Sequence, residues 1–274
     1  MRLLVFGPGY AASRLAPRLE PHGWRVVTVT RETFADRGLT EFQIAQATHI
    51  LSSVPPEGDA DAVLAAYRPA LSHASAWLGY LSSTGVYGDA AGAWVDESAP
   101  IGTGRRTARS EADAAWLDLG ARVFRLPGIY GLGRSPLDRI RAGTATRIDV
   151  PGQVFSRIHV DDLVEGVIAG FDGPPGAYNL ADDSPAPQSK VIAYGCTLLG
   201  LPVPPLVPLA SAGLSPAARA FYAENRRIAN GKAKRLLGWR PRYADYRLGL
   251  RALSATTSPA STSTAPATAS PDQR

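Results

Sequence analysis

The sequence predicts an α/β protein that consists of a doubly wound parallel sheet, a small C-terminal cap and a disordered tail. Short apolar runs alternate with stretches of helical spacing in the N-terminal half, which is the pattern of parallel strands joined by helices. Glycine, proline and polar residues follow the ends of these runs, where such sheets place their ligand sites. After about residue 132 this regularity fades.

The chain opens with one complete strand-helix-strand unit. The apolar run at residues 2–6 stops at a Gly-Pro-Gly sequence, as a buried strand does before a tight turn. Residues 11–20 have helical spacing with Leu15 and Leu19 on one face, and residues 24–30 alternate like a second strand.

The same alternation continues after this unit. Further strands are expected at residues 48–54, which end in a Pro-Pro pair, at residues 77–83, and at residues 122–126, which end in Pro-Gly. Helices are expected at residues 61–70 and 110–119. Together these elements predict a parallel sheet with helices on both faces.

We expect two interleaved regions and a tail. Residues 1–170 should form mainly the sheet domain, and residues 171–253 mainly the cap. Residues 254–274 are almost entirely Ser, Thr, Ala and Pro, with almost no apolar bulk. Such a segment cannot bury enough surface to offset the entropy cost of ordering, so we predict that it is disordered.

Composition and charge argue against several classes of function. The net charge of +5 comes almost wholly from dispersed arginines without interleaved aromatics, which indicates a nucleotide phosphate or solvent rather than a nucleic acid. No apolar run approaches about 18 residues, so we expect no membrane association and a cytoplasmic location. Cys196 is the single cysteine, and the four histidines lack the spacing of metal ligands, so no metal is expected.

A glycine-rich turn after the first strand predicts a dinucleotide site. Residues 7–12, Gly-Pro-Gly-Tyr-Ala-Ala, match Gly-x-Gly-x-x-Ala at the start of the first expected helix. Gly7 permits the tight turn, Gly9 lets a diphosphate approach the backbone, and Ala12 lets helix and strand pack closely. We therefore expect a Rossmann-type domain whose cofactor rests on this turn and contacts Tyr10.

The end of the second strand indicates which cofactor binds. NAD sites usually place an acidic residue there, whereas this chain has Arg31, with Glu32 one residue further on. A guanidinium can bind a 2′-phosphate, so we favour NADP over NAD. Four residues at the ends of other strands complete the expected cofactor site: Ser53, Pro55, Pro127 and Gly128.

Six motifs in order resemble the extended short-chain dehydrogenase/reductases, in their atypical NAD-dependent epimerase/dehydratase branch. Besides the glycine turn, they are residues 81–88 (Leu-Ser-Ser-Thr-Gly-Val-Tyr-Gly), 125–131, 157–162, 178–183 and 236–241. The resemblance covers residues 1 to about 252. It implies that residues 125–131 pass the nicotinamide and that residues 157–162 anchor the cap. It also implies that residues 178–183 form a returning strand of the cap, and it leaves a homodimer open.

The catalytic Tyr-x-x-x-Lys pair of that family is absent. Counting to its position leads to Arg105 and Arg109, and the chain has only three lysines, all far downstream: Lys190, Lys232 and Lys234. A guanidinium cannot exchange a proton at neutral pH as tyrosine does. The resemblance assigns Ser83 the hydrogen bond to substrate and leaves Arg109 as an electrostatic anchor.

Three hypotheses for the chemistry follow. In the first, Tyr87, Tyr130 or a water supplies the proton. In the second, the protein binds NADP and a ligand without turnover, as non-catalytic sensors or regulatory proteins do. In the third, Arg105, Arg106 and Arg109 bind a phosphate or carboxylate of a substrate that is already activated.

We favour an NADP-dependent oxidoreductase or epimerase that acts on a polar carbonyl or nucleotide-sugar-like small molecule. Its catalytic candidates are Ser83, Arg109 and Tyr87. Two neighbouring features are expected to be structural: Asp161 and Asp162 should cap a helix that begins there, and His159 should be a satisfied structural histidine.

Overall fold

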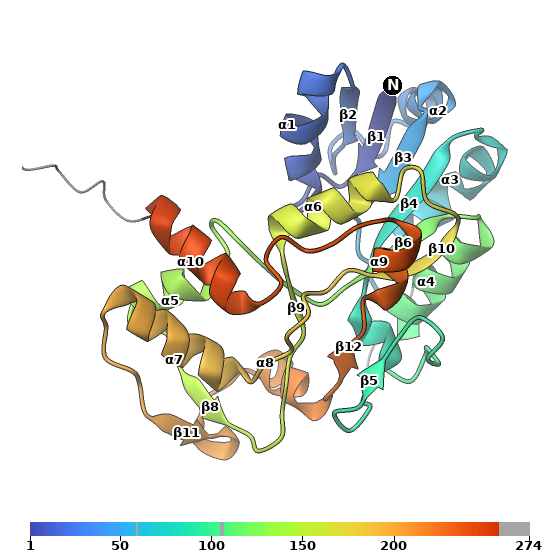
Figure 1. Cartoon of the computed structure of the whole chain (residues 1–274). Helices are drawn as coiled ribbons and strands as arrows, with labels where there is room; N and C mark the ends of the chain where they lie inside the picture. The colour runs from blue at the N-terminus through green and yellow to red at the C-terminus, as the bar shows by residue number, and fades with distance from the viewer. Residues whose placement is uncertain (59, 105–106, 258–274) are drawn as a thin grey trace, which may run out of the picture.

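A six-stranded parallel sheet forms the centre of the molecule (Figure 1). The computed structural model describes residues 1–58, 60–104 and 107–257. Every pairing within the sheet is parallel, in the order β10-β6-β4-β3-β1-β2. The strands are β1 (Arg2–Phe6), β2 (Arg25–Val29), β3 (His49–Ser52), β4 (Trp77–Ser83), β6 (Arg122–Leu126) and β10 (Gly176–Asn179).

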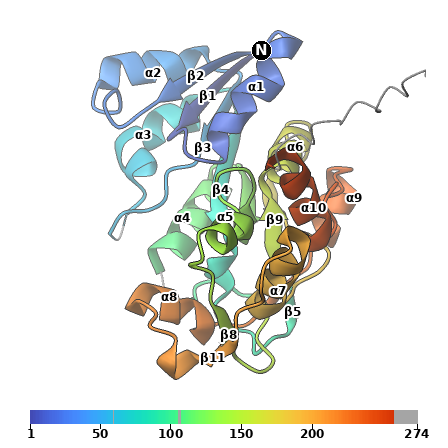
Figure 2. The ribbon, with the colours of Figure 1, turned by 90° about the vertical axis from the view of Figure 1, so that its left-hand side faces the viewer.

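Helices cover both faces of this sheet, and Figure 2 shows them on opposite sides of β1 and β2. One face buries α1 (Leu15–Leu19) and α6 (Val160–Ala169) in a core that includes Leu3, Val5 and Phe124. The other face buries α2 (Arg37–Gln46), α3 (Ala62–His73) and α4 (Thr107–Asp118) against Leu4 and Phe6. Burial on both faces explains the continuous apolar run Leu3–Phe6 in β1.

Two helices on the second face begin at aspartate caps. The Asp36 carboxylate accepts the Leu39 N–H at 3.0 Å at the start of α2, and the Asp61 carboxylate accepts the Leu64 N–H at 2.9 Å at the start of α3. α2 was not expected from the sequence, because its apolar Leu39 and Phe42 lie on the exposed side and weaken the periodic signal.

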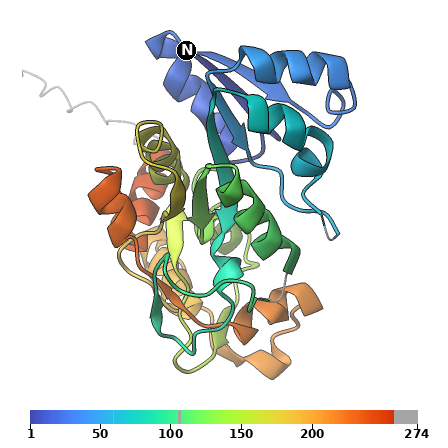
Figure 3. The same ribbon diagram turned by 90° about the vertical axis from the view of Figure 1, so that its right-hand side faces the viewer.

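The cap lies beyond the carboxyl ends of the strands (Figure 3). Three short parallel pairs belong to this part of the chain: β7 (Gly128–Tyr130) with β9 (Arg157–His159), β8 (Arg147–Asp149) with β11 (Leu206–Pro208), and β5 (Trp94–Val95) with β12 (Arg227–Ile228). Its core joins Tyr130 to three helices, which are α5 (Pro136–Arg141), α7 (Gln188–Leu199) and α10 (Tyr246–Thr257). Two further short helices, α8 (Pro216–Ala220) and α9 (Gly231–Leu236), complete the α-helices of the described residues.

The structure confirms the α/β parallel-sheet prediction and corrects three details. Residues 178–179 lie in β10, which pairs with β6 in the central sheet, so this strand does not belong to the cap. The first helix is divided, with 3₁₀ turns at Ala12–Arg14 and Glu20–His22 on either side of α1. α10 continues through residues 254–257, and the remainder of the predicted tail lies outside the described residues. Within the described part of the chain, none of the helices has the length and apolar character needed to span a bilayer.

A glycine in α10 allows the cap core to close over Tyr130. A side chain at Gly249 would overlap the Tyr130 hydroxyl. We expect Gly249→Ala to lower the free energy of unfolding by about 1–3 kcal/mol through overpacking, measured by urea denaturation. In a Tyr130→Phe background the cost should shrink, because the nearest overlapping atom is gone. An equal cost in both backgrounds would show that the overlap is not the cause.

Candidate cofactor and substrate site

The glycine-rich turn is held in place by hydrogen bonds to residues at the ends of the two neighbouring strands, β2 and β3. Gly7 has a φ of +70°, and a side chain there would lie 2.8 Å from Val54 Cγ2. Its N–H donates to the Val29 carbonyl at 3.0 Å, and its carbonyl accepts the Ser53 hydroxyl at 2.7 Å. Only glycine suits this position, and Ser53 serves the site by holding the turn.

The side of the same turn that carries Gly9 faces open space. Gly9 is exposed, and a side chain there would meet only Ser53 Oγ at 3.9 Å and the Gly7 carbonyl at 4.0 Å. The backbone N–H groups of Tyr10 and Ala11 bind no backbone acceptor among the described residues. Ala12 is buried against the strand. Free N–H groups above a bare glycine form a cradle that suits a diphosphate.

Arg31 is exposed and lies two residues after the end of β2, the strand that pairs with β1. The neighbouring Glu32 carboxylate accepts the Thr30 hydroxyl at 2.5 Å, and this hydrogen bond lowers the pKa of Glu32. The adjacent strand ends carry Pro55, which is exposed, and the Pro127–Gly128 turn, of which Gly128 is exposed. The predicted cofactor residues therefore gather along the carboxyl edge of the sheet, where the sequence placed them.

Ser83 ends β4 and caps the turn that follows it. The Ser83 hydroxyl oxygen accepts the Gly85 N–H at 3.1 Å at the start of a 3₁₀ turn, Thr84–Tyr87. Two close backbone contacts hold this turn: a side chain on Gly104 would overlap the Gly85 carbonyl, and one on Gly88 would lie 2.7 Å from Thr103. Ser83 thus occupies a rigid position and its hydroxyl proton can still be donated.

Tyr87 is a buried structural residue. Its hydroxyl donates to Asn179 Oδ1 at 2.8 Å and accepts from Arg125 Nη1 at 3.0 Å. Burial raises the pKa of Tyr87, although Arg125 opposes the rise. With both hydrogen-bonding functions of the hydroxyl in use, this position argues against proton exchange with a substrate. We do not carry Tyr87 forward as a catalytic candidate.

A buried ion pair, which sequence reasoning missed, lies behind Ser83. Arg125 donates to both oxygens of Asp113, from Nη2 at 2.7 Å and from Nε at 3.1 Å, and the Ser82 hydroxyl donates to Asp113 at 2.6 Å. Both partners are nearly inaccessible to solvent. Burial by itself lowers the pKa of Arg125, but the hydrogen bonds and charge of Asp113 raise it above its ordinary value. The available signal was an acid on the buried face of the expected helix, one turn after Arg109.

Arg109 lies half-buried in the first turns of α4, one helical turn before Asp113. Its charge acts on Tyr80, whose pKa burial raises and Arg109 lowers in part. The other members of the expected arginine group, Arg105 and Arg106, lie outside the described residues. The catalytic assignment of Arg109 stays a prediction.

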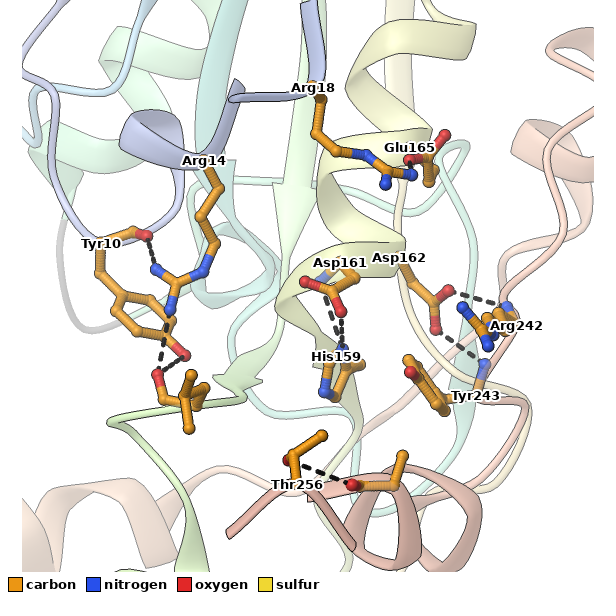
Figure 4. A network of polar contacts seen from close by, with 12 residues as sticks. Tyr10, Arg14, Arg18, His159, Asp161, Asp162, Glu165, Arg242, Tyr243 and Thr256 are labelled. Carbon is orange, nitrogen blue, oxygen red and sulfur yellow. Dashed lines mark hydrogen bonds and ion pairs between the residues drawn. The ribbon is translucent and has the colours of Figure 1, made fainter. Parts of the chain in front are cut away.

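The start of α6 differs from the expected aspartate cap (Figure 4). His159 Nδ1 accepts the Asp161 N–H at 3.2 Å, so the histidine caps the helix. The Asp162 carboxylate instead accepts the N–H groups of Arg242 and Tyr243, at 2.8 and 2.9 Å. Asp162 therefore holds the C-terminal segment against the sheet domain.

His159 is not the fully satisfied histidine that the sequence suggested. Its Nε2 is buried and has no hydrogen-bond partner among the described residues. Burial lowers the pKa of His159, which keeps the ring neutral at pH 7. Its ring packs between Tyr130 and Tyr243, which agrees with a structural role.

Solved structures share this architecture. A functionally unknown conserved protein from Silicibacter pomeroyi DSS is 42% identical, covers 93% of this chain and 98% of its own, and superposes with a TM-score of 0.85. A dTDP-glucose 4,6-dehydratase from Bacillus anthracis in complex with NAD is 16% identical, with coverage of 93% and 96% and a TM-score of 0.68. The chain shares the fold of this NAD-bound dehydratase. A human epimerase family protein with NADPH, 17% identical, covers 93% of this chain and 99% of its own with a TM-score of 0.66.

Sequence comparison adds one curated relative of this chain. A 3-diazoavenalumate denitrifying reductase from a Streptomyces species is 29% identical over 178 residues, which are 57% of this chain and 58% of the relative. The chain therefore aligns with little more than half the length of that protein. No protein-family model matches the chain. The solved neighbours include both an NAD and an NADPH complex, so the shared fold leaves the choice of cofactor open.

Proposed function

We propose that the protein is an NADP-dependent reductase of a small polar substrate. The observation that carries this proposal is the open cradle above Gly9, with Arg31 at the end of the next strand. Tyr10 and Ala11 offer free N–H groups to a diphosphate, and Arg31 offers a guanidinium to a 2′-phosphate. Pro127 and Gly128 would lie along the nicotinamide. When bound, the reduced cofactor would supply a hydride to an electrophilic centre of the substrate.

The residues at the expected substrate position suit a reaction in which no tyrosine has to donate a proton to the substrate. Both positions of the usual pair are arginine, and the Tyr87 hydroxyl is committed to Asn179 and Arg125. Ser83 can donate one hydrogen bond to a substrate oxygen, and Arg109 can hold an anionic group. Reversible oxidation of a sugar alcohol requires a base at this place, so carbonyl or nucleotide-sugar chemistry fits less well than reduction of an activated electrophile.

The curated relative supports this preference. Its name describes a reductase that removes nitrogen from a diazo compound. An electrophile that expels nitrogen as it is reduced needs no proton on a carbonyl oxygen, so the reaction can proceed without a tyrosine-lysine pair. The solved neighbours agree with a nicotinamide cofactor in general.

The loss of that pair also favours a second candidate, a non-catalytic NADP sensor. The two functions separate when NADPH fluorescence titration is run beside an NADPH oxidation assay with benzenediazonium, benzaldehyde and UDP-glucose. Oxidation with benzenediazonium above the rate without protein would support the reductase. Binding of NADPH without oxidation by any substrate would favour the sensor, and failure to bind NADPH or NADH would overturn both.

The preference for NADP rests on Arg31 and can be tested directly. We expect Arg31→Ala to raise the Kd for NADPH roughly 10- to 100-fold, since charged hydrogen bonds contribute about 1.5–3 kcal/mol. The Kd for NADH should stay unchanged because NADH lacks the 2′-phosphate. Arg37→Ala, an exposed arginine at the start of α2, is the matched control for net charge. Equal NADPH affinity in the parent and Arg31→Ala would refute the assignment.

A further inference from the structure

A guanidinium lies beside the turn that the cofactor is proposed to use. Arg157 is on β9, directly opposite Gly128 on β7. A side chain on Gly128 would lie 4.0 Å from Arg157 Cγ, so the stem of the arginine passes this exposed glycine. Arg157 was singled out in the sequence only as the start of the segment that anchors the cap.

The hydrogen bonds of Arg157 leave one side of the guanidinium unused. Nη1 donates to the carbonyls of Phe155, at 2.7 Å, and Ala186, at 3.0 Å. Among the described residues, neither Nε nor Nη2 has a hydrogen-bond partner, although the side chain is only partly exposed. Nε and Nη2 together form the edge of an arginine that binds the two oxygens of a carboxylate.

No carboxylate of the described chain neutralises this arginine by contact. Asp182 is the acid with the largest electrostatic effect on Arg157, but the two form no ion pair. Among the described residues, Asp182 Oδ2 is buried and has no hydrogen-bond partner. Burial raises the pKa of Asp182 to about 8, although the charge of Arg157 opposes the rise. A partly buried cation without a counter-ion is costly, and a bound anion would offset that cost.

The nearby acids are already engaged elsewhere. The Asp183 carboxylate accepts hydrogen bonds from Asn230 and Lys234, and the Asp245 carboxylate accepts the N–H groups of Arg247 and Leu248 at the start of α10. None of these carboxylates forms an ion pair with Arg157, so an anionic ligand could pair with it directly.

Aromatic rings flank the same arginine. Phe155 and Tyr222, both partly exposed, meet edge to face with ring centroids 5.4 Å apart, and the Phe155 carbonyl is one of the acceptors of Arg157. We infer that Arg157 binds the carboxylate of the substrate through Nε and Nη2, and that the substrate is an aromatic carboxylate whose ring lies against Phe155 and Tyr222. This inference rests on the proposed function and adds the class of substrate to it.

The test uses the full chain with NADPH and two probes of matched shape, cinnamate and cinnamamide. Binding of each probe to the NADPH complex is measured by isothermal titration calorimetry, with the Kd for NADPH measured separately by fluorescence. We expect the parent to bind cinnamate at least tenfold more tightly than cinnamamide. Arg157→Met should weaken cinnamate at least tenfold and leave cinnamamide and NADPH unchanged. Arg157→Lys, which keeps the charge but loses the paired edge, should fall between the two.

Circular dichroism of both variants checks that the cap is folded, and Arg139→Met, an exposed arginine in α5, is the control for net charge. Equal affinity for the two probes, no binding of cinnamate, or full cinnamate binding by folded Arg157→Met would overturn the inference. Each of these outcomes leaves the Kd for NADPH intact. Failure of the parent to bind NADPH would instead refute the proposed function, so the two failures are distinguishable.

Discussion

Replacement of Asp113 by alanine is expected to lower the free energy of unfolding by about 3–5 kcal/mol, because it leaves the buried Arg125 charge without its partner. Arg125 is 3% exposed, and its other side-chain hydrogen bond is to Tyr87, which is neutral. The measurement is urea denaturation of the two proteins under the same conditions. The same change should loosen the Ser83 turn, since Ser82 loses its acceptor as well.

Two variants separate charge pairing from general damage to α4. Asp118→Ala removes an exposed acid from the last position of the same helix, and we expect a change within about 0.5 kcal/mol. The double variant Asp113→Leu/Arg125→Met replaces both charges by apolar groups and should recover most of the loss. A double variant as unstable as Asp113→Ala would show that the ion pair is not the main contribution of Asp113.

Gly9→Val is expected to abolish cofactor binding without unfolding the protein. The side chain would point into the open space of the cradle, where its nearest neighbour is Ser53 Oγ, so stability should hardly change. A diphosphate could no longer reach the free N–H groups, and the Kd for NADPH should rise roughly 100-fold or more, which corresponds to about 2.7 kcal/mol. Fluorescence titration gives the affinity, and thermal unfolding without cofactor gives the stability.

Gly7→Ala is the matched comparison and should behave in the opposite way. Its φ of +70° and the close approach of Val54 Cγ2 make any side chain unfavourable. We expect a loss of about 1–2 kcal/mol from the left-handed conformation alone, even without cofactor. If Gly9→Val were the less stable variant, or bound NADPH as the parent does, the assignment of the cradle would be wrong.

Three strands appear at the residues that the sequence predicted, β1, β4 and β6. These strands are buried on both faces, so most of their residues are apolar, and β1 and β6 stop directly before Gly7 and Pro127. α2 was missed because Leu39 and Phe42 face solvent and disturb the helical pattern. Its start depends on one cap, Asp36, which resembles any other aspartate in a polar loop.

In the candidate site too, some features were predictable from the sequence and others were not. The glycine turn was predictable because the need for glycine at positions 7 and 9 comes from the local backbone conformation, which a few neighbouring residues determine. The role of Tyr87 was not, because its hydroxyl is bound by Asn179, 92 residues away in the chain. The pairing of Asp113 with Arg125 likewise depends on how α4 packs on β6.

The sequence by itself determined the class of fold, the position of the glycine-rich turn and the absence of the tyrosine-lysine pair. These properties follow from local periodicity, from glycine conformation and from residue identity. The tertiary structure decided which polar groups are already bound and which remain available. Tyr87 and Asp113 are engaged by distant partners, whereas the free edge of Arg157 and the cradle above Gly9 are not. Hydrogen-bond partners are set by packing between distant segments, so only the folded chain shows them.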